Sequence, residues 1–168
     1  MSDVKDFGPY SAKEVKSFMG MDGAGYNCTL YRNRKKIAFC IDEGRGGEVH
    51  INWVTSDRDE EKRLLVSHVK SLPKVKSEYC AKDLEIDEGW FVEELVEKFE
   101  QEKDIRKVRR QCNEKILYRT PDQKKEVYYV FSAPYSKTIA DALRKKYGQG
   151  IEIFNEVFEQ GNVPSVFV

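Results

Sequence analysis

The sequence predicts an α+β fold, with an N-terminal three-stranded antiparallel meander, two helices of which the second is long, and a C-terminal unit in the order β-hairpin, helix, strand. Three observations support this class. Short runs between residues 26 and 54 alternate apolar and polar side chains, as half-buried strands do. Apolar residues recur at helical spacing over residues 87–112. Between two strand-like runs in the last third of the chain, Ser136 is placed to cap a helix.

The first element is expected to be a short helix over residues 12–19. Ser11 and Glu14 have the spacing of a capping box, in which the serine caps the first turn and the glutamate reaches back to the serine backbone. Gly20 would then end the helix, because glycine readily takes the left-handed conformation found after helix C-termini.

The meander is predicted from strands over residues 26–31, 36–41 and 49–54, with a two-residue turn at Asn33 and Arg34. Such a turn requires a positive φ at Arg34, which is unfavourable for arginine. It sets a register in which the apolar residues share one face, with the pairs Leu30–Ile37, Cys28–Phe39, Tyr26–Ile41, Ile41–Val49, Phe39–Ile51 and Ile37–Trp53.

Two helices are predicted after the meander. The first is capped by Ser56 or Asp57 and runs to Ser71, where Pro73 stops it. A polar connector over residues 74–83 leads to the long helix over residues 87–112. The connector favours two domains, residues 1–73 and 84–168, although a chain of 168 residues also fits one compact domain.

The last third is predicted to contain strands over residues 116–118 and 126–132, which flank a turn at Pro121 and Asp122. A helix capped by Ser136 should run to about residue 146, and a strand should follow over residues 151–158. The apolar tail, residues 163–168, is expected to dock as an extended segment.

Composition excludes several classes of function. The 29 basic and 29 acidic residues cancel, which argues against both a general nucleic-acid coat and an acidic DNA mimic. The four cysteines, at positions 28, 40, 80 and 112, match no zinc-site spacing, so we expect neither a metal nor a cofactor and infer a reducing cytosol. No stretch approaches the length of a membrane span, and no membrane partner is expected.

Two glycine-rich loops are predicted at the same end of the meander, because Tyr26 begins the first strand and its partner Ile41 ends the second. They form a candidate binding edge for a partner backbone or a small anion, with the residues Asp22, Gly23, Gly25, Asp42, Glu43, Arg45, Gly46 and Gly47. The alternative is structural, since glycines also supply positive φ in tight connections. The loops match neither the P-loop nor the dinucleotide-binding pattern.

The basic end of the long helix is an alternative site, for nucleic acid. Its cations precede a tyrosine-rich hairpin, and cations beside aromatic rings can hold a backbone and stack bases. The residues are Lys103, Arg106, Lys107, Arg109 and Arg110, followed by Tyr118, Tyr128 and Tyr129. Because the start of the same helix is acidic, the charge pattern also complements the helix macrodipole, and both interpretations stay open.

A third hypothesis is a small enzyme. The predicted register puts Cys40 opposite His50 and beside Asn27 on the outer face of the meander, and these residue types can form an activated nucleophile. The chain has only two histidines and no paired-acid motif, so we expect a binding protein rather than an enzyme.

Residues 23–53 resemble a segment that recurs in small uncharacterised accessory proteins of tailed bacteriophages. The matching positions are Gly23, Gly25, Asn27, Leu30 to Arg32, Lys35 to Ala38, Asp42, Gly46, Gly47 and Trp53. Arg34 departs from the pattern, which has glycine at this turn, and residues 145–156 also resemble the end of such proteins. The resemblance implies a phage protein that acts in the bacterial host cytoplasm and inhibits or modulates a host component, such as an anti-phage defence protein.

Overall fold

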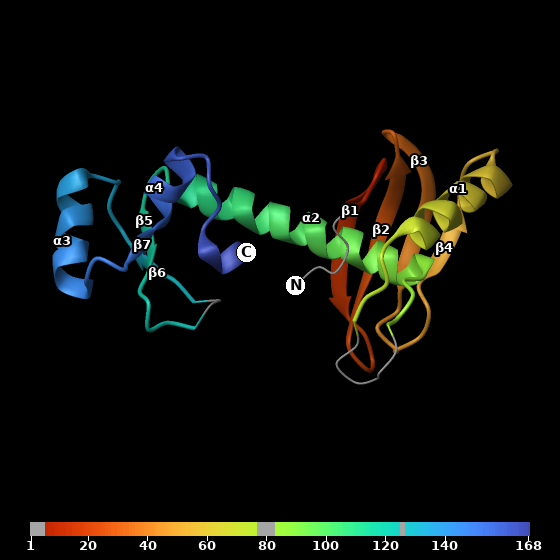
Figure 1. Cartoon of the computed structure of the whole chain (residues 1–168), viewed down its shortest axis with the longest axis horizontal. Coiled ribbons are helices and arrows are strands. Elements are labelled where there is room, and N and C mark those ends of the chain that lie inside the picture. The colour runs from red at the N-terminus through yellow and green to blue at the C-terminus, as the bar shows by residue number, and fades with distance from the viewer. Residues whose placement is uncertain (1–5, 77–82, 125–126) are drawn as a thin grey trace. The chain divides into compact units, whose positions relative to one another are not determined.

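The computed structural model describes residues 6–76, 83–124 and 127–168 (Figure 1). The chain divides into two compact units, Met1–Glu100 and Gln101–Val168, and the division falls inside the long helix α2, Glu88–Gln111. Each unit combines an antiparallel sheet with helices, so the predicted α+β class is confirmed. No helix in the described ranges is both long and apolar enough to cross a bilayer.

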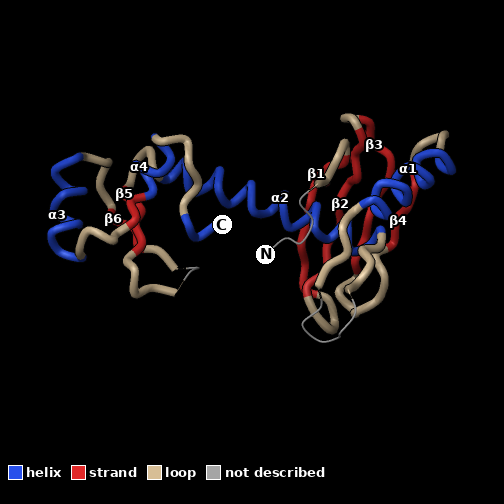
Figure 2. Tube along the Cα trace, in the orientation of Figure 1, coloured by secondary structure: helices blue, strands red, loops and turns tan. Residues whose placement is uncertain are grey.

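The first unit is a four-stranded antiparallel sheet covered on one face by helices. The strands are β1 (Tyr10–Met19), β2 (Ala24–Arg32), β3 (Lys35–Asp42) and β4 (His50–Trp53), in the order β1-β2-β3-β4. Helix α1 (Arg58–Ser71) and the start of α2 pack against this sheet (Figure 2), and their buried residues Leu65, Phe91 and Leu95 join the strand residues in one apolar core.

The predicted helix over residues 12–19 is wrong, because this segment is strand β1. Tyr10 and Ala12 are buried while Ser11 and Lys13 between and after them are more exposed, which is the alternation of a half-buried strand. Glu14 does not reach back to Ser11. It lies at a bulge with φ 55° and accepts a 2.7 Å hydrogen bond from the Thr29 hydroxyl on β2. Pairing with β2 therefore outweighs the local capping signal.

The three predicted meander strands are present, and the two-residue turn is confirmed, with φ 48° at Asn33 and 67° at Arg34. The predicted register is wrong by one residue, because β3 carries an extra residue, Ile37, at a bulge. The observed pairs are Leu30–Ala38, Cys28–Cys40, Tyr26–Asp42, Cys40–Ile51 and Ile41–His50.

The bulge exchanges the two faces of β3. Ile37 and Ala38 are both fully buried, Cys40 is buried in place of Phe39, and the Phe39 side chain is 40% exposed. A one-residue shift moves every later side chain to the opposite face of the sheet, which explains why all three predicted pairs of this hairpin fail together.

Both predicted helices after the meander are confirmed. Asp57 is the N-cap residue of α1, although its carboxylate pairs with Lys35 and not with the helix backbone. Asp87 caps α2, because its Oδ1 accepts a 2.7 Å hydrogen bond from the Trp90 amide. Within the predicted connector, Val75 pairs with Leu84, and residues 77–82, which include Cys80, lie outside the described residues.

The second unit is built on a three-stranded sheet in the order β6-β5-β7, with β5 (Ile116–Arg119) between β6 (Tyr129–Phe131) and β7 (Glu152–Ile153). Helix α3 (Lys137–Tyr147) begins at the predicted cap, where the Ser136 Oγ accepts a 3.3 Å hydrogen bond from the Ile139 amide. Residues 125–126, at the start of the predicted hairpin strand, lie outside the described residues.

The predicted strand over residues 151–158 is wrong beyond Ile153, because the chain turns into helix α4 (Phe154–Glu159). The consecutive residues Phe154 and Asn155 are both buried, which a half-buried strand does not allow. Asn155 holds the junction, since its Oδ1 accepts from the Leu117 amide at 3.2 Å and its Nδ2 donates to the carbonyls of Cys112 and Lys115, between α2 and β5. The tail ends in a short 3₁₀ turn, Ser165–Phe167, rather than fully extended.

Candidate functional site

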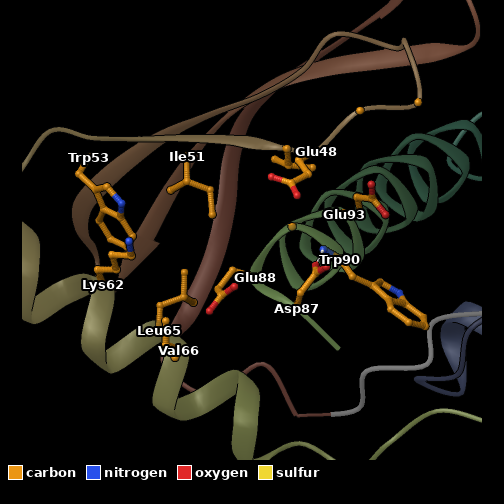
Figure 3. A pocket seen from close by; sticks show the side chains of 14 residues that line it. Glu48, Ile51, Trp53, Lys62, Leu65, Val66, Asp87, Glu88, Trp90 and Glu93 are labelled. Atoms are coloured by element: carbon orange, nitrogen blue, oxygen red, sulfur yellow. Dashed lines mark hydrogen bonds between the residues drawn. The ribbon is translucent and has the colours of Figure 1, made fainter. Parts of the chain in front are cut away.

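An open groove of about 770 Å³ lies in the first unit, between β4, α1 and the start of α2 (Figure 3). It is lined by Gly46, Gly47, Glu48, Val49, Ile51, Trp53, Lys62, Leu65, Val66, Asp87, Glu88, Gly89, Trp90 and Glu93. Segments separated by more than thirty residues in sequence thus share one concave surface of the size that small ligands and peptide side chains occupy.

Apolar side chains form the walls of this groove. Along β4, Ile51 and Trp53 are half-buried while His50 and Asn52 are exposed, so the strand turns alternate side chains toward the helices. Across the groove, α1 contributes Leu65 and Val66. Figure 3 shows Trp53 and Lys62 together near one end, and Trp90 and Glu93 projecting from α2 at the other.

Carboxylates dominate the charged groups of the groove. Of the residues that the structure describes, four carboxylates line it, Glu48, Asp87, Glu88 and Glu93, and Lys62 is the only cation that does. Asp87 is used as the cap of α2. Over residues 6–76, 83–124 and 127–168, no ion pair engages Glu48, Glu88 or Glu93. Counted over the described residues, the groove therefore carries more negative than positive charge.

Glu93 lies in an environment that disfavours its ionised form. Partial desolvation, followed by the negative charges of Asp42 and Asp87, raises the pKa of Glu93 above its ordinary value. Like charges this close oppose each other's ionisation. A cation placed in the groove would relieve this repulsion, because it would favour the ionised form of each carboxylate.

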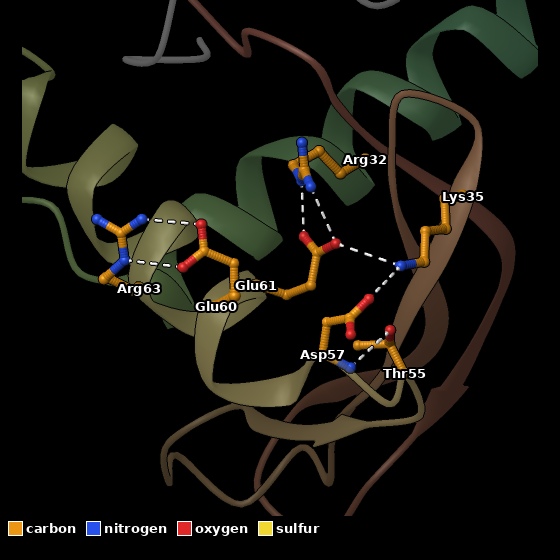
Figure 4. Close-up of polar contacts among 7 residues, drawn as sticks. All are labelled: Arg32, Lys35, Thr55, Asp57, Glu60, Glu61 and Arg63. Carbon is orange, nitrogen blue, oxygen red and sulfur yellow. Dashed lines mark hydrogen bonds and ion pairs between the residues drawn. The ribbon is translucent and has the colours of Figure 1, made fainter.

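A buried ion pair holds α1 in the position that forms one wall of the groove (Figure 4). Arg32 on β2 donates two hydrogen bonds to Glu61 on α1, from Nε at 2.6 Å and from Nη2 at 2.9 Å. The Glu61 side chain is only 2% exposed, and the Lys35 Nζ lies 3.7 Å from its second oxygen. The hydrogen bonds from Arg32, more than any other cause, lower the pKa of Glu61.

The two predicted glycine loops lie at one end of the sheet and contact each other directly. The Asp22 amide donates to the Gly44 carbonyl at 3.0 Å, and a Cβ added to Gly20 would lie 2.4 Å from the Glu43 carbonyl oxygen. Backbone of one loop therefore fills the space that a ligand would need between them. Of the eight predicted binding residues, only Gly46 and Gly47 line the groove.

The other predicted loop residues contact atoms within the two loops themselves. Gly23 contributes its carbonyl to the contact with Gly44, and a Cβ on Gly25 would lie 2.6 Å from the Asp42 carbonyl oxygen. Asp42 Oδ1 accepts a 2.8 Å hydrogen bond from the Gly44 amide. Arg45 and Glu43 form an exposed ion pair with each other at 3.5 Å.

The cations predicted as a nucleic-acid site belong to the part of α2 in the second unit, and all of them are exposed: Lys103, Arg106, Lys107, Arg109 and Arg110. The Arg109 guanidinium covers the Phe158 ring at 4.8 Å, in the cluster that also contains Tyr128. Tyr118 packs instead against Tyr129, with ring centroids 5.4 Å apart, and joins the cluster formed with α3. The three predicted tyrosines are thus divided between two clusters.

Cys40 and His50 do not face each other. Cys40 is fully buried opposite Cys28 and Ile51, and its hydrogen bond to Cys28, together with burial, raises the pKa of the Cys40 thiol. His50 is exposed and lies opposite Ile41. The predicted outer-face constellation is therefore wrong, and its cause is the bulge that shifts β3 by one residue. Among the described residues, no group of three His, Cys, Asp or Glu side chains is arranged to hold a metal ion.

For the carboxylates at the start of α2, the sequence offers complementarity to the helix macrodipole as one interpretation. That interpretation fits Asp87 and Glu88 in the first turn, but the dipole effect falls off within one turn and does not account for Glu93. The sequence signal that could have indicated the site is Glu93 itself, an acidic residue beyond the first turn of α2 and close in sequence to Trp90. Nothing local connects it to Glu48 or Trp53, which reach the groove only through the fold.

No known protein family, no curated protein and no solved structure matches this chain.

Proposed function

We propose that this chain is a non-enzymatic binding protein whose groove holds a basic segment of a partner protein. One observation carries the proposal: an open groove of about 770 Å³ with apolar walls is bordered, within the described ranges, by four carboxylates and a single lysine. Complementary charge across an interface steers association and selects partners.

The groove suits the chemistry of long basic side chains. Lysine and arginine have apolar stems and a charged end, and they bury the stem along apolar surface while the charge stays near oxygen atoms. Ile51, Leu65 and Val66 offer such surface. Glu88 and Glu93, which have no ion-pair partner among the described residues, offer the oxygen atoms.

The resemblance of residues 23–53 to bacteriophage accessory proteins supports a bacterial host protein, or a component of an anti-phage defence system, as the partner. In this proposal the chain acts in the host cytoplasm and modulates or inhibits that partner by occupying its basic segment. The choice of a bacterial partner rests on the sequence resemblance and not on the chemistry of the groove.

Tryptophan fluorescence tests the groove directly, because the chain has two tryptophans, Trp53 and Trp90, and both line it. Decalysine should change this fluorescence and bind less tightly as salt rises, whereas decaglutamate should not bind. Glu88→Gln should weaken decalysine binding severalfold. Asp59→Asn is the matched control, since Asp59 is an exposed carboxylate on α1 outside the groove. Equal binding by the two variants would refute the groove as the site.

A further inference from the structure

The four-stranded sheet of the first unit ends differently at its two edges. At one edge, β1 carries a bulge between Lys13 and Lys16, where Glu14 has a φ of 55°, and both lysines are exposed. Bulges and charged side chains are means by which proteins prevent another strand from pairing with a sheet edge. At the other edge, β4 pairs with β3 without a register shift, and its sequence His-Ile-Asn-Trp contains neither lysine nor proline. The β4 edge therefore lacks these protections.

The backbone of β4 presents unpaired hydrogen-bonding groups to that edge. The Val54 amide donates to the Ile37 carbonyl at 3.0 Å, and along an antiparallel pair every second residue bonds to the neighbouring strand. Asn52 therefore directs its N–H and C=O groups toward β3, whereas Ile51 and Trp53 direct theirs away from it. Within the described ranges, no hydrogen bond from another element reaches the backbone of Ile51 or Trp53.

The apolar core is incomplete along the same edge. Directly paired residues share a face of the sheet, so Leu30, Ala38 and Trp53 form one row across β2, β3 and β4 on the face that the helices cover. Leu30 and Ala38 are fully buried, and Ala12, which continues the row on β1, is 6% exposed. Trp53 is only half-buried, and it lines the groove together with Ile51 (Figure 3). The groove therefore occupies the place where the side chains of a next strand would lie beside the helices.

We propose that the basic segment of the partner protein binds as a fifth strand on the free edge of β4. This inference rests on the proposed function and specifies how the groove is occupied. The backbone groups of Ile51 and Trp53 bond to the segment, and every second side chain of the segment points into the groove, because paired residues share a face. Charge selects the occupant, since Glu48, Glu88 and Glu93 border the groove and favour lysine or arginine at those alternate positions.

Backbone N-methylation of a cationic peptide separates strand addition from simple charge attraction. The probe is a decapeptide in which lysine alternates with threonine, a residue that favours strands. A strand directs the N–H groups of one alternate set of its residues to the neighbouring strand and those of the other set away from it. Methylating all lysine amides or all threonine amides keeps the charge. One of these two peptides should bind about tenfold more weakly than the unmethylated peptide, while the other binds equally.

Amide hydrogen exchange locates the bound strand on the protein. With the unmethylated peptide at saturation, exchange at Ile51 and Trp53 should slow about tenfold, because their amides gain an acceptor. The Asn52 amide is the internal control, since it bonds to β3 already and should not change. Ile51→Pro removes one outward N–H, and it should weaken peptide binding about fivefold relative to Ile51→Ala, which keeps that N–H. The methylated peptides apply the same test without any change in the protein.

Failure of strand addition can be distinguished from failure of the groove. Salt-sensitive binding of decalysine, with equal effects of the two methylation patterns and unchanged exchange at Ile51 and Trp53, would overturn strand addition and leave the acidic groove standing as a site for cations. Absence of binding by both decalysine and the alternating peptide would overturn both proposals. Exchange at Ile51 and Trp53 that slows in the free protein as its concentration rises would assign the edge to a second copy of this chain and overturn a partner segment as its occupant.

Discussion

The ion pair between Arg32 and Glu61 makes the sharpest prediction about stability, because the two charges differ in exposure. Arg32→Met leaves the Glu61 carboxylate buried, with only Lys35 at 3.7 Å to compensate it. Breaking a buried pair in this way costs about 3–5 kcal/mol, and the remaining lysine places the expected cost at about 3 kcal/mol. Glu61→Leu should cost less, about 2 kcal/mol, because the Arg32 side chain is 26% exposed and can be hydrated.

The double variant distinguishes pairing from simple loss of contacts. Arg32→Met combined with Glu61→Leu removes both charges and should cost about 1 kcal/mol or less, since apolar residues of similar volume replace buried ion pairs at little cost. Urea unfolding followed by tryptophan fluorescence measures these values, because Trp53 and Trp90 both belong to the first unit. Additive costs in the double variant, or a smaller cost for Arg32→Met than for Glu61→Leu, would refute the reasoning.

The pair between Arg63 and Glu60 is a matched control for this experiment (Figure 4). It has the same two-bond geometry, at 3.0 and 2.8 Å, but its side chains are 69% and 53% exposed. Solvent screens exposed pairs, so Arg63→Met should leave the urea midpoint unchanged within error. A loss comparable to that of Arg32→Met would show that burial is not what gives the Arg32–Glu61 pair its strength.

The Arg32–Glu61 pair also predicts how the free energy of unfolding changes at acid pH. The folded-state pKa of Glu61 is lowered, chiefly by hydrogen bonds from Arg32. A lowered carboxylate pKa contributes stability that is fully present above the unfolded value, near 4.5, and is lost as the pH falls through the lowered folded value. The difference in free energy of unfolding between the native protein and Arg32→Met should therefore be constant near neutrality and shrink below pH 4.5.

Two further predictions concern the other structural sites. Asn155→Ala should destabilise the second unit by about 3 kcal/mol, because it leaves one amide and two carbonyls without their partner, and hydrogen exchange at the Leu117 amide should accelerate; unchanged exchange there would contradict this. Gly44→Ala should cost about 2 kcal/mol more than Gly46→Ala in thermal unfolding, since both glycines have positive φ but only at Gly44 would the new Cβ meet backbone, at 2.6 Å. Equal losses of stability in the two variants would mean that the positive φ, and not the contact between the loops, is what requires glycine at position 44.

The elements predicted correctly are those whose signals are local. Asp57, Asp87 and Ser136 each stand at the start of a helix, and the turn at Asn33 forms where the alternation of the flanking strands requires it. A capping residue or a tight turn depends on a few neighbouring residues, so its sequence pattern locates the element where no pairing with another strand competes.

Two of the errors, in β1 and in the register of β3, have the same physical origin. The capping box at Ser11 is a valid local signal, but pairing with β2 gives the same residues more hydrogen bonds and a buried face. The bulge at Ile37 leaves no mark in the alternation of residues 36–41, yet it reverses the faces of β3 and buries Cys40. In both cases a neighbouring strand decides the outcome, and a linear pattern does not contain the neighbour.

The sequence by itself determined the α+β class, the positions of the confirmed helices and the convergence of the two glycine loops at one sheet end. The tertiary structure alone decided which side chains share a surface. Glu48, Trp53, Leu65 and Glu93 line one groove only because β4, α1 and α2 pack around it, which brings charged and apolar side chains from distant parts of the sequence together. Electrostatic repulsion and apolar burial depend on distance in space, which is why the candidate site emerged from packing and not from any motif.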